Sequence, residues 1–165
     1  MEPKQFISGK IILIVDDEPD VLDTLSALLD ICRIDTATTF EEGKRLLENN
    51  LYDVTILDIM GVRGFELLEI AKKRDIPALM LTAHALSEES LKKSAENGAS
   101  YYAPKDQINK IDVFLADVLE ARQKNKSAWI KVFERLGGFF DKKFGGPDWR
   151  EKEQEFWEER TKIFR

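Results

Sequence analysis

The sequence has one cysteine, Cys32, and no long run of apolar residues. A single cysteine cannot form a disulfide within the chain, and its place after an apolar, helix-like stretch predicts a buried, small apolar role. No apolar run approaches the roughly 20 residues that span a bilayer, and the first residues lack the basic and apolar regions of a signal peptide. We therefore expect a cytoplasmic protein without a membrane-spanning segment.

Positive charge is scarce in the first 120 residues, which hold 13 Lys and Arg against 23 Asp and Glu, a net charge of −10. Residues 121–165 hold 12 against 8, a net charge of +4. An acidic body argues against nucleic acid as the main partner, because binding to a phosphate backbone needs a clustered positive surface. The length of 165 residues allows one ordinary domain and a smaller appendage.

Apolar, β-branched runs alternate with amphipathic, helix-like segments over about 120 residues. The expected strands are residues 10–15, 34–37, 53–58, 77–82 and 101–103, and helices are expected to open near residues 19, 39, 65, 87 and 108. Thr39 and Glu42 form a capping-box pattern, and Asn97-Gly98 is typical of a left-handed helix end. Five strand-helix units predict an α/β fold, a doubly wound parallel sheet with helices on both faces. Right-handed crossovers then place a ligand site at the carboxyl ends of the strands.

Acidic residues stand where two of these strands end. Asp16 and Asp17 follow the first strand, and Asp58 ends the third, so the fold brings three carboxylates to one small pocket. A hard divalent cation would relieve their repulsion, and Mg²⁺ prefers oxygen ligands and bridges to phosphate. An aspartate so placed can also act as a nucleophile that forms an acyl phosphate.

The next two strands end in groups that can stabilise phosphoryl oxygens, Thr82 after the fourth and Lys105 after the fifth. Each residue alone also has an ordinary explanation: acidic residues in a solvated turn, a helix cap for Thr82, a surface lysine for Lys105. Their occurrence in order, one at each strand end, favours a phosphoryl-transfer site.

Over residues 9–122 the chain resembles the receiver domain of two-component response regulators. The matching segments are Ile14-Val15-Asp16-Asp17-Glu18, Leu57-Asp58-Ile59-Met60, Leu81-Thr82-Ala83 and Tyr102-Ala103-Pro104-Lys105. The resemblance implies a sheet of strand order 2-1-3-4-5 and a phosphate acceptor at Asp58.

The resemblance also implies roles for the other residues of the site. Asp17, Asp58 and the Met60 backbone carbonyl would bind Mg²⁺, with Asp16 acting through a water molecule. Thr82 and Lys105 would contact the phosphoryl group. Thr82 would move toward it while Tyr102 turns inward and alters the surface of the last two helices and the fifth strand. His84, two residues beyond Thr82, is a candidate for tuning the dephosphorylation rate, and an exposed histidine without a role is the equal alternative.

The implied donor is a phosphohistidine on a histidine kinase or phosphotransfer protein, and no separate output enzyme is expected. A phosphorylation-independent receiver-like scaffold or dimerisation module is the alternative function. An aspartyl-phosphate phosphatase fits less well, since position 60 holds Met where a second aspartate is usual.

The sequence departs from the family in two loops. The loop Met60-Gly61-Val62-Arg63-Gly64 is short and lacks proline, and proline precedes Lys105 instead of following it. A cis bond, if present, would therefore be Ala103–Pro104. Arg63 is more simply an exposed arginine than a phosphate ligand.

Residues 1–122 are expected to form the receiver domain and residues 123–165 a helical, aromatic-rich extension. Nine of the 16 aromatic residues lie in this extension, with helical spacing from Trp129 to Phe140. Gly137-Gly138 and Gly145-Gly146-Pro147 are expected to interrupt the helices, and Asp148 to cap a last one. The aromatic face could fold back on the receiver, pack within a small helical hairpin, pair with a second copy, or bind a downstream protein.

Overall fold

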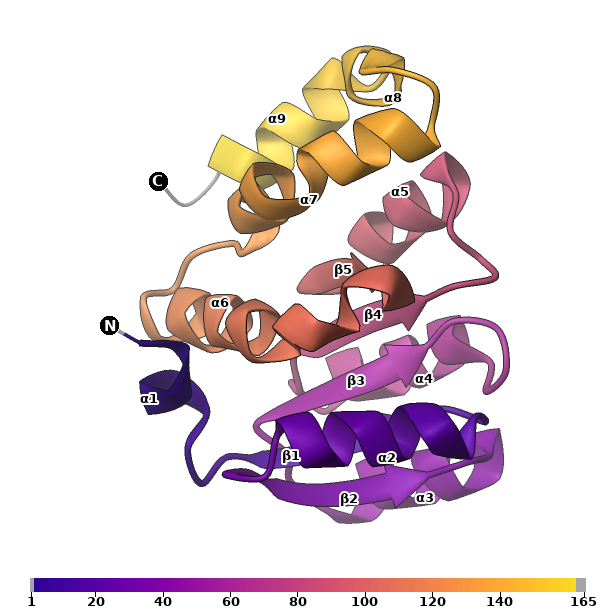
Figure 1. Cartoon of the computed structure of the whole chain (residues 1–165), viewed down its shortest axis with the longest axis vertical. Helices are drawn as coiled ribbons and strands as arrows, with labels where there is room; N and C mark the ends of the chain where they lie inside the picture. The colour runs from indigo at the N-terminus through magenta and orange to yellow at the C-terminus, as the bar shows by residue number, and fades with distance from the viewer. Residues whose placement is uncertain (1, 163–165) are drawn as a thin grey trace.

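The computed structural model describes residues 2–162 and contains a five-stranded parallel sheet with helices on both faces (Figure 1). The strands are β1 (Ile11–Val15), β2 (Arg33–Ala37), β3 (Val54–Asp58), β4 (Ala78–Thr82) and β5 (Tyr101–Pro104). They lie in the order β2-β1-β3-β4-β5, and every neighbouring pair is parallel. The predicted fold class and strand order are therefore confirmed.

The helices form two layers around the sheet. One face is covered by α2 (Pro19–Leu28) and α6 (Ile111–Gln123), which is preceded by the 3₁₀ helix η1 (Lys105–Lys110). The other face is covered by α3 (Phe40–Asn49), α4 (Gly64–Lys73) and α5 (Glu88–Glu96) (Figure 1). This division follows from the right-handed crossovers of the chain, which change face where the strand order reverses.

Local sequence signals explain where most of these elements begin and end. The central strands β3 and β4 are buried at every residue, as expected for continuous apolar runs. Thr39 caps α3 by accepting a hydrogen bond from the Glu42 N–H, and Ser87 caps α5 by accepting one from Ser90 N–H. Gly98 ends α5 with a φ of 90°.

A short first helix, α1 (Pro3–Ile7), was not predicted from the sequence. It packs against α6, and Ile7 is buried. Cys32 packs against the core but is only half-buried, and its thiol donates to the Ile7 carbonyl at 3.2 Å, so the predicted buried apolar role is met only in part. The surrounding apolar atoms raise the pKa of the Cys32 thiol to about 11.

The extension forms three helices, α7 (Trp129–Lys143), α8 (Asp148–Glu151) and α9 (Gln154–Lys162), which lie beyond the β5 edge of the sheet (Figure 1). The expected break at Gly137-Gly138 is wrong, because α7 runs through both residues. Leu136 precedes the two glycines and Phe140 follows two positions after them, and both side chains are buried. Their packing outweighs the low helix propensity of glycine.

The chain does turn at Gly145-Gly146, whose φ values are 80° and 129°. Asp148 is the first residue of α8, and its side chain does not cap a helix. Residues 163–165 of the predicted extension lie outside the described residues. Within residues 2–162, no helix combines the length and apolar character needed to cross a membrane.

Candidate functional site

Four strand ends meet at the carboxyl edge of the sheet. Asp16 follows β1, Asp58 is the last residue of β3, Thr82 is the last residue of β4, and Lys105 follows β5. Neighbouring parallel strands bring these positions together although they are far apart in the sequence. Asp16, Asp58 and Thr82 are buried, with 1%, 6% and 1% of their surface exposed.

Lys105 links the acidic residues. Its ammonium nitrogen lies 2.8 Å from Asp16 Oδ2, 2.8 Å from Glu18 Oε1 and 3.1 Å from Asp58 Oδ1. The proline before Lys105 does not keep the side chain away from the site. No cis peptide bond occurs within residues 2–162, so Ala103–Pro104 is trans.

The electrostatics of the site are those of a half-buried cation among several carboxylates. Burial alone would lower the pKa of Lys105, but its interactions with Asp16 and Glu18 and the charge of Asp58 outweigh burial and raise it. For Asp16 the balance is the opposite. Burial raises the pKa of Asp16 more than the Lys105 ammonium and the Glu18 N–H lower it. One ammonium therefore does not fully compensate these carboxylates.

The short loop after β3 packs tightly against Asp58. Gly61 N–H donates to Asp58 Oδ2 at 3.1 Å. At Gly64 a Cβ atom would lie 2.2 Å from the Asp58 backbone oxygen, so only glycine allows α4 to start this close to the end of β3. Arg63, with a φ of 54°, bonds to Glu66 and lies over the Phe40 ring, 3.9 Å from its centre. The Arg63 guanidinium is thus held by partners outside the acidic cluster.

The acidic residues present fit a hard cation. Asp16, Asp17 and Glu18 each present one carboxylate oxygen, and these three oxygens lie within 4.8 Å of one another. Asp16 Oδ2 lies 2.8 Å from Lys105 Nζ, but the geometry of this contact is that of an ion pair and not of a hydrogen bond. This buried oxygen can therefore still accept a ligand. Sequence reasoning missed Glu18, although it directly follows Asp16-Asp17.

Two of the predicted ligands, Asp17 and the Met60 carbonyl, occupy different surroundings from the buried Asp16 and Asp58. Asp17 is exposed and has no hydrogen bond or ion pair within residues 2–162. The Met60 carbonyl accepts a long, 3.4 Å hydrogen bond from Arg63 N–H, which closes the loop.

A cavity of about 450 Å³ opens beside Asp58. Its lining residues are Asp17, Glu18, Asp58, Met60, Gly61, Thr82 and His84. Thr82 Oγ1 accepts a hydrogen bond from Ala85 N–H at 3.0 Å, which leaves its hydroxyl proton available to a ligand in the cavity. The structure therefore places His84 at this cavity, with an exposed side chain.

Tyr102 does not line this cavity. The residue is fully buried, and its hydroxyl lies 2.6 Å from Ser90 Oγ, below the loop that joins β4 to α5. Its ring packs 5.7 Å from the Phe140 ring of α7. Tyr102 is therefore already turned inward, and the extension covers it.

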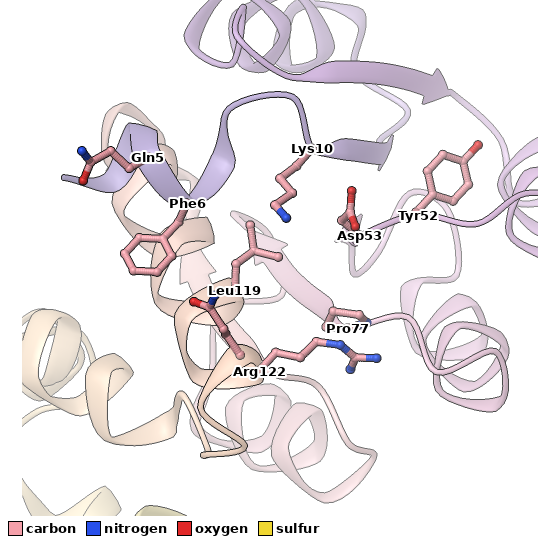
Figure 2. A pocket seen from close by; sticks show the side chains of 9 residues that line it. Gln5, Phe6, Lys10, Tyr52, Asp53, Pro77, Leu119 and Arg122 are labelled. Carbon is pink, nitrogen blue, oxygen red and sulfur yellow. The ribbon is translucent and has the colours of Figure 1, made fainter. Parts of the chain in front are cut away.

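A second cavity, of about 500 Å³, lies at the opposite edge of the sheet, away from the acidic residues (Figure 2). Lys10 points into it beside Asp53, whose carboxylate accepts a hydrogen bond from Ile11 N–H. Arg122 at its rim is paired with Asp75. The charged groups other than Lys10 thus have structural partners, and the chemistry of the molecule lies at the carboxyl edge.

Comparisons with known proteins agree with this geometry. The model of the response regulator receiver domain matches residues 12–116. A two-component response regulator of Arabidopsis thaliana is 37% identical over 107 residues, 61% of this chain and 17% of the relative. A heme response regulator of Staphylococcus haemolyticus is 34% identical over 127 residues, 73% of this chain and 56% of the relative.

Solved structures give the same result. A CheY-like receiver domain protein from Methanospirillum hungatei is 32% identical with a TM-score of 0.57, covering 67% of this chain and 97% of that one. The present chain spans about half, or less, of the length of the two curated relatives. The match over residues 12–116, together with the fold and the strand-end residues, shows that the chain belongs to the response regulator receiver domain family.

Proposed function

We propose that the chain accepts a phosphoryl group on Asp58, in a reaction that depends on Mg²⁺, from a histidine kinase or a phosphotransfer protein. The observation that carries this proposal is the position of the Asp58 carboxylate. It borders a cavity of about 450 Å³, with Lys105 Nζ 3.1 Å from one oxygen and Gly61 N–H on the other. A nucleophile held by two donors at an open cavity is suited to in-line attack on phosphorus.

In the proposed step, an Asp58 oxygen forms a bond to phosphorus while the bond from phosphorus to the donor imidazole nitrogen breaks. Later attack by water on phosphorus restores the carboxylate and releases inorganic phosphate. Lys105 and the Thr82 hydroxyl bind the transferred oxygens as negative charge builds on them. Thr82 is buried and Lys105 is half-buried and paired with Asp58, so both donors are held in place.

Asp17, Asp58 and the Met60 carbonyl would hold Mg²⁺, with Asp16 acting through a water molecule, and Glu18, which clusters with Asp16 and Asp17, could also contribute an oxygen. When bound, the ion would neutralise the charge shared by the carboxylates and the phosphoryl group. The buried Asp16 Oδ2, which accepts no hydrogen bond, supports this assignment, because burial raises the pKa of Asp16 more than Lys105 lowers it and a divalent cation would offset that cost.

The output of this step would be a switch of the molecular surface. Thr82 would turn toward the phosphoryl group, and the loop from Ala83 to Ser87 would follow because Ala85 is bonded to Thr82. The inward position of Tyr102 fits beneath that loop. His84, exposed at the cavity, would influence how readily water reaches the acyl phosphate. The residues of the chain itself would catalyse both phosphoryl transfers. A cytoplasmic location and the absence of a separate output enzyme remain predictions from the sequence.

Intact mass after incubation with Mg²⁺ and acetyl or carbamoyl phosphate tests the proposal. We expect a single phosphate adduct that disappears when Mg²⁺ is removed with a chelator. The matched control is Asp58→Asn, which keeps the shape of the side chain and should show no adduct. A folded wild-type protein that forms no adduct with several donors would point instead to a phosphorylation-independent scaffold.

A further inference from the structure

The extension covers one face of the receiver, formed by α5, β5 and α6. Trp129 at the start of α7 donates from its indole N–H to the Ala99 carbonyl, 2.9 Å away, just before β5. Arg135 binds both carboxylate oxygens of the buried Asp117 on α6, at 2.6 and 3.0 Å. Figure 1 shows α7 lying along this edge of the molecule, between α5 and α6. Helix α7 therefore covers the edge strand β5.

Tyr102 lies beneath the centre of this contact. It stands on an edge strand, where an aromatic side chain would ordinarily keep some exposure, yet none of its surface is exposed. Phe140, also fully buried, packs its ring 5.7 Å from the Tyr102 ring. A Tyr102 ring that turned outward would have to enter the space that Phe140 fills. Docking of the extension is therefore compatible only with the inward position.

A continuous series of contacts joins Tyr102 to the acceptor site. The Tyr102 hydroxyl bonds with Ser90 Oγ, and Ser90 Oγ also donates to the Ala85 carbonyl. Ala85 N–H in turn donates to Thr82 Oγ1, which borders the same cavity as Asp58. The loop between β4 and α5 is thus held at one end by the switch threonine and at the other by the tyrosine under the extension.

We propose that the extension is the receiver's own docking partner, and that its docking and the phosphorylation of Asp58 stabilise each other. This inference rests on the function proposed above, in which Thr82 turns toward the phosphoryl group while Tyr102 is inward. Phe140 holds Tyr102 inward, so the docked extension favours the arrangement that binds phosphoryl oxygens. By thermodynamic linkage, a phosphoryl group must then favour docking by the same factor.

Hydrogen exchange of the full chain, with and without Mg²⁺ and beryllofluoride, tests one direction of this coupling. Beryllofluoride serves as the probe because it stands in for the phosphoryl group on the aspartate without turning over. We expect the backbone amides of residues 129–143 to exchange more slowly by at least about 5-fold when the probe is bound. Faster exchange there would mean that the extension is released, for example to pair with a second copy, and would overturn the proposal.

Calorimetric titration of beryllofluoride into variants tests the other direction. Phe140→Leu, which removes the ring but keeps an apolar side chain, and Phe140→Ala should weaken binding by at least about 5-fold. The first control is Phe139→Ala, which removes the neighbouring ring of α7; this ring packs 5.9 Å from that of Phe140, and no ring contact between Phe139 and Tyr102 is seen within residues 2–162. The second control is Leu47→Ala, which leaves a cavity beneath α3 and so destabilises the protein at a place far from the extension. Both controls should bind within about 2-fold of wild type.

The outcomes separate this inference from the proposed function. If wild type binds beryllofluoride and a folded Phe140→Leu binds it equally well, the acceptor site stands and the coupling is wrong. If wild type neither binds the probe nor forms a phosphate adduct, the proposed function fails and the coupling fails with it. Circular dichroism of each variant before titration confirms that it is folded.

Discussion

Lys105 and the glycines of the short loop determine what the acceptor site can bind. One ammonium lies within 3.1 Å of three carboxylates, so the cluster keeps an excess of negative charge in a partly buried position. The loop backbone is close enough to these carboxylates to limit their movement. At Gly61, an added Cβ would lie 2.2 Å from the carboxyl carbon of Asp17. Space as well as charge would therefore define the position of the proposed metal ion.

We predict that Gly61→Ala weakens Mg²⁺ binding more than it destabilises the fold. The added methyl group must displace the Asp17 carboxylate, which is exposed and can move at small cost, but only away from the position facing Asp16. The free energy of unfolding should change by less than about 1 kcal/mol, as for most surface substitutions. Mg²⁺ titration and urea unfolding measure the two effects. Unchanged Mg²⁺ affinity would show that Asp17 is not a ligand.

At the scale of secondary structure, α7 is an amphipathic helix. One face buries Trp129, Val132, Leu136 and Phe140, and the opposite face is polar. The two central glycines differ in their surroundings. A Cβ at Gly138 would meet open space, whereas one at Gly137 would lie 2.8 Å from the Arg150 guanidinium, which is paired with Asp141 at 2.9 Å.

These glycines form a matched pair for a stability measurement. Gly138→Ala should stabilise the protein by up to about 1 kcal/mol, because alanine has the higher helix propensity and nothing obstructs its methyl group. Gly137→Ala gains the same propensity but must displace Arg150, so it should be less stable than Gly138→Ala. Urea unfolding of both variants measures the difference. Equal stabilisation would mean that the Arg150–Asp141 pair adjusts without cost.

For the whole molecule, the aromatic residues of the extension and the apolar residues of the receiver form one continuous core. Trp149 contacts the rings of Phe140 and Trp157, and Phe140 contacts Tyr102 of β5. The buried cluster extends without interruption from Ile7 to Trp157. Segments that share one core are expected to unfold together.

Thermal unfolding should therefore show a single transition. All three tryptophans lie in the extension, so their fluorescence reports on the extension, while far-ultraviolet circular dichroism reports mainly on the larger receiver. We expect the two signals to give the same midpoint. A fluorescence transition at clearly lower temperature would show that the extension detaches before the receiver unfolds.

Local signals in the sequence were sufficient for the receiver fold. Continuous apolar runs, the caps at Thr39 and Ser87 and the turn at Gly98 depend on a few neighbouring residues, so they can be recognised without a structure. The order of the strand ends also predicted that Asp16, Asp58, Thr82 and Lys105 would meet, because parallel topology leaves few alternatives.

Contacts between distant segments were decided only by the tertiary structure. Helix α1 and the unbroken course of α7 through Gly137-Gly138 depend on packing partners that local periodicity does not show. The role of Glu18 as a second partner of Lys105, and the burial of Tyr102 under Phe140, arise where segments far apart in the sequence meet. The sequence by itself thus determined the receiver and its reactive residues. Only long-range packing, whose free energy depends on both contacting surfaces, decided that the extension packs over Tyr102 and β5.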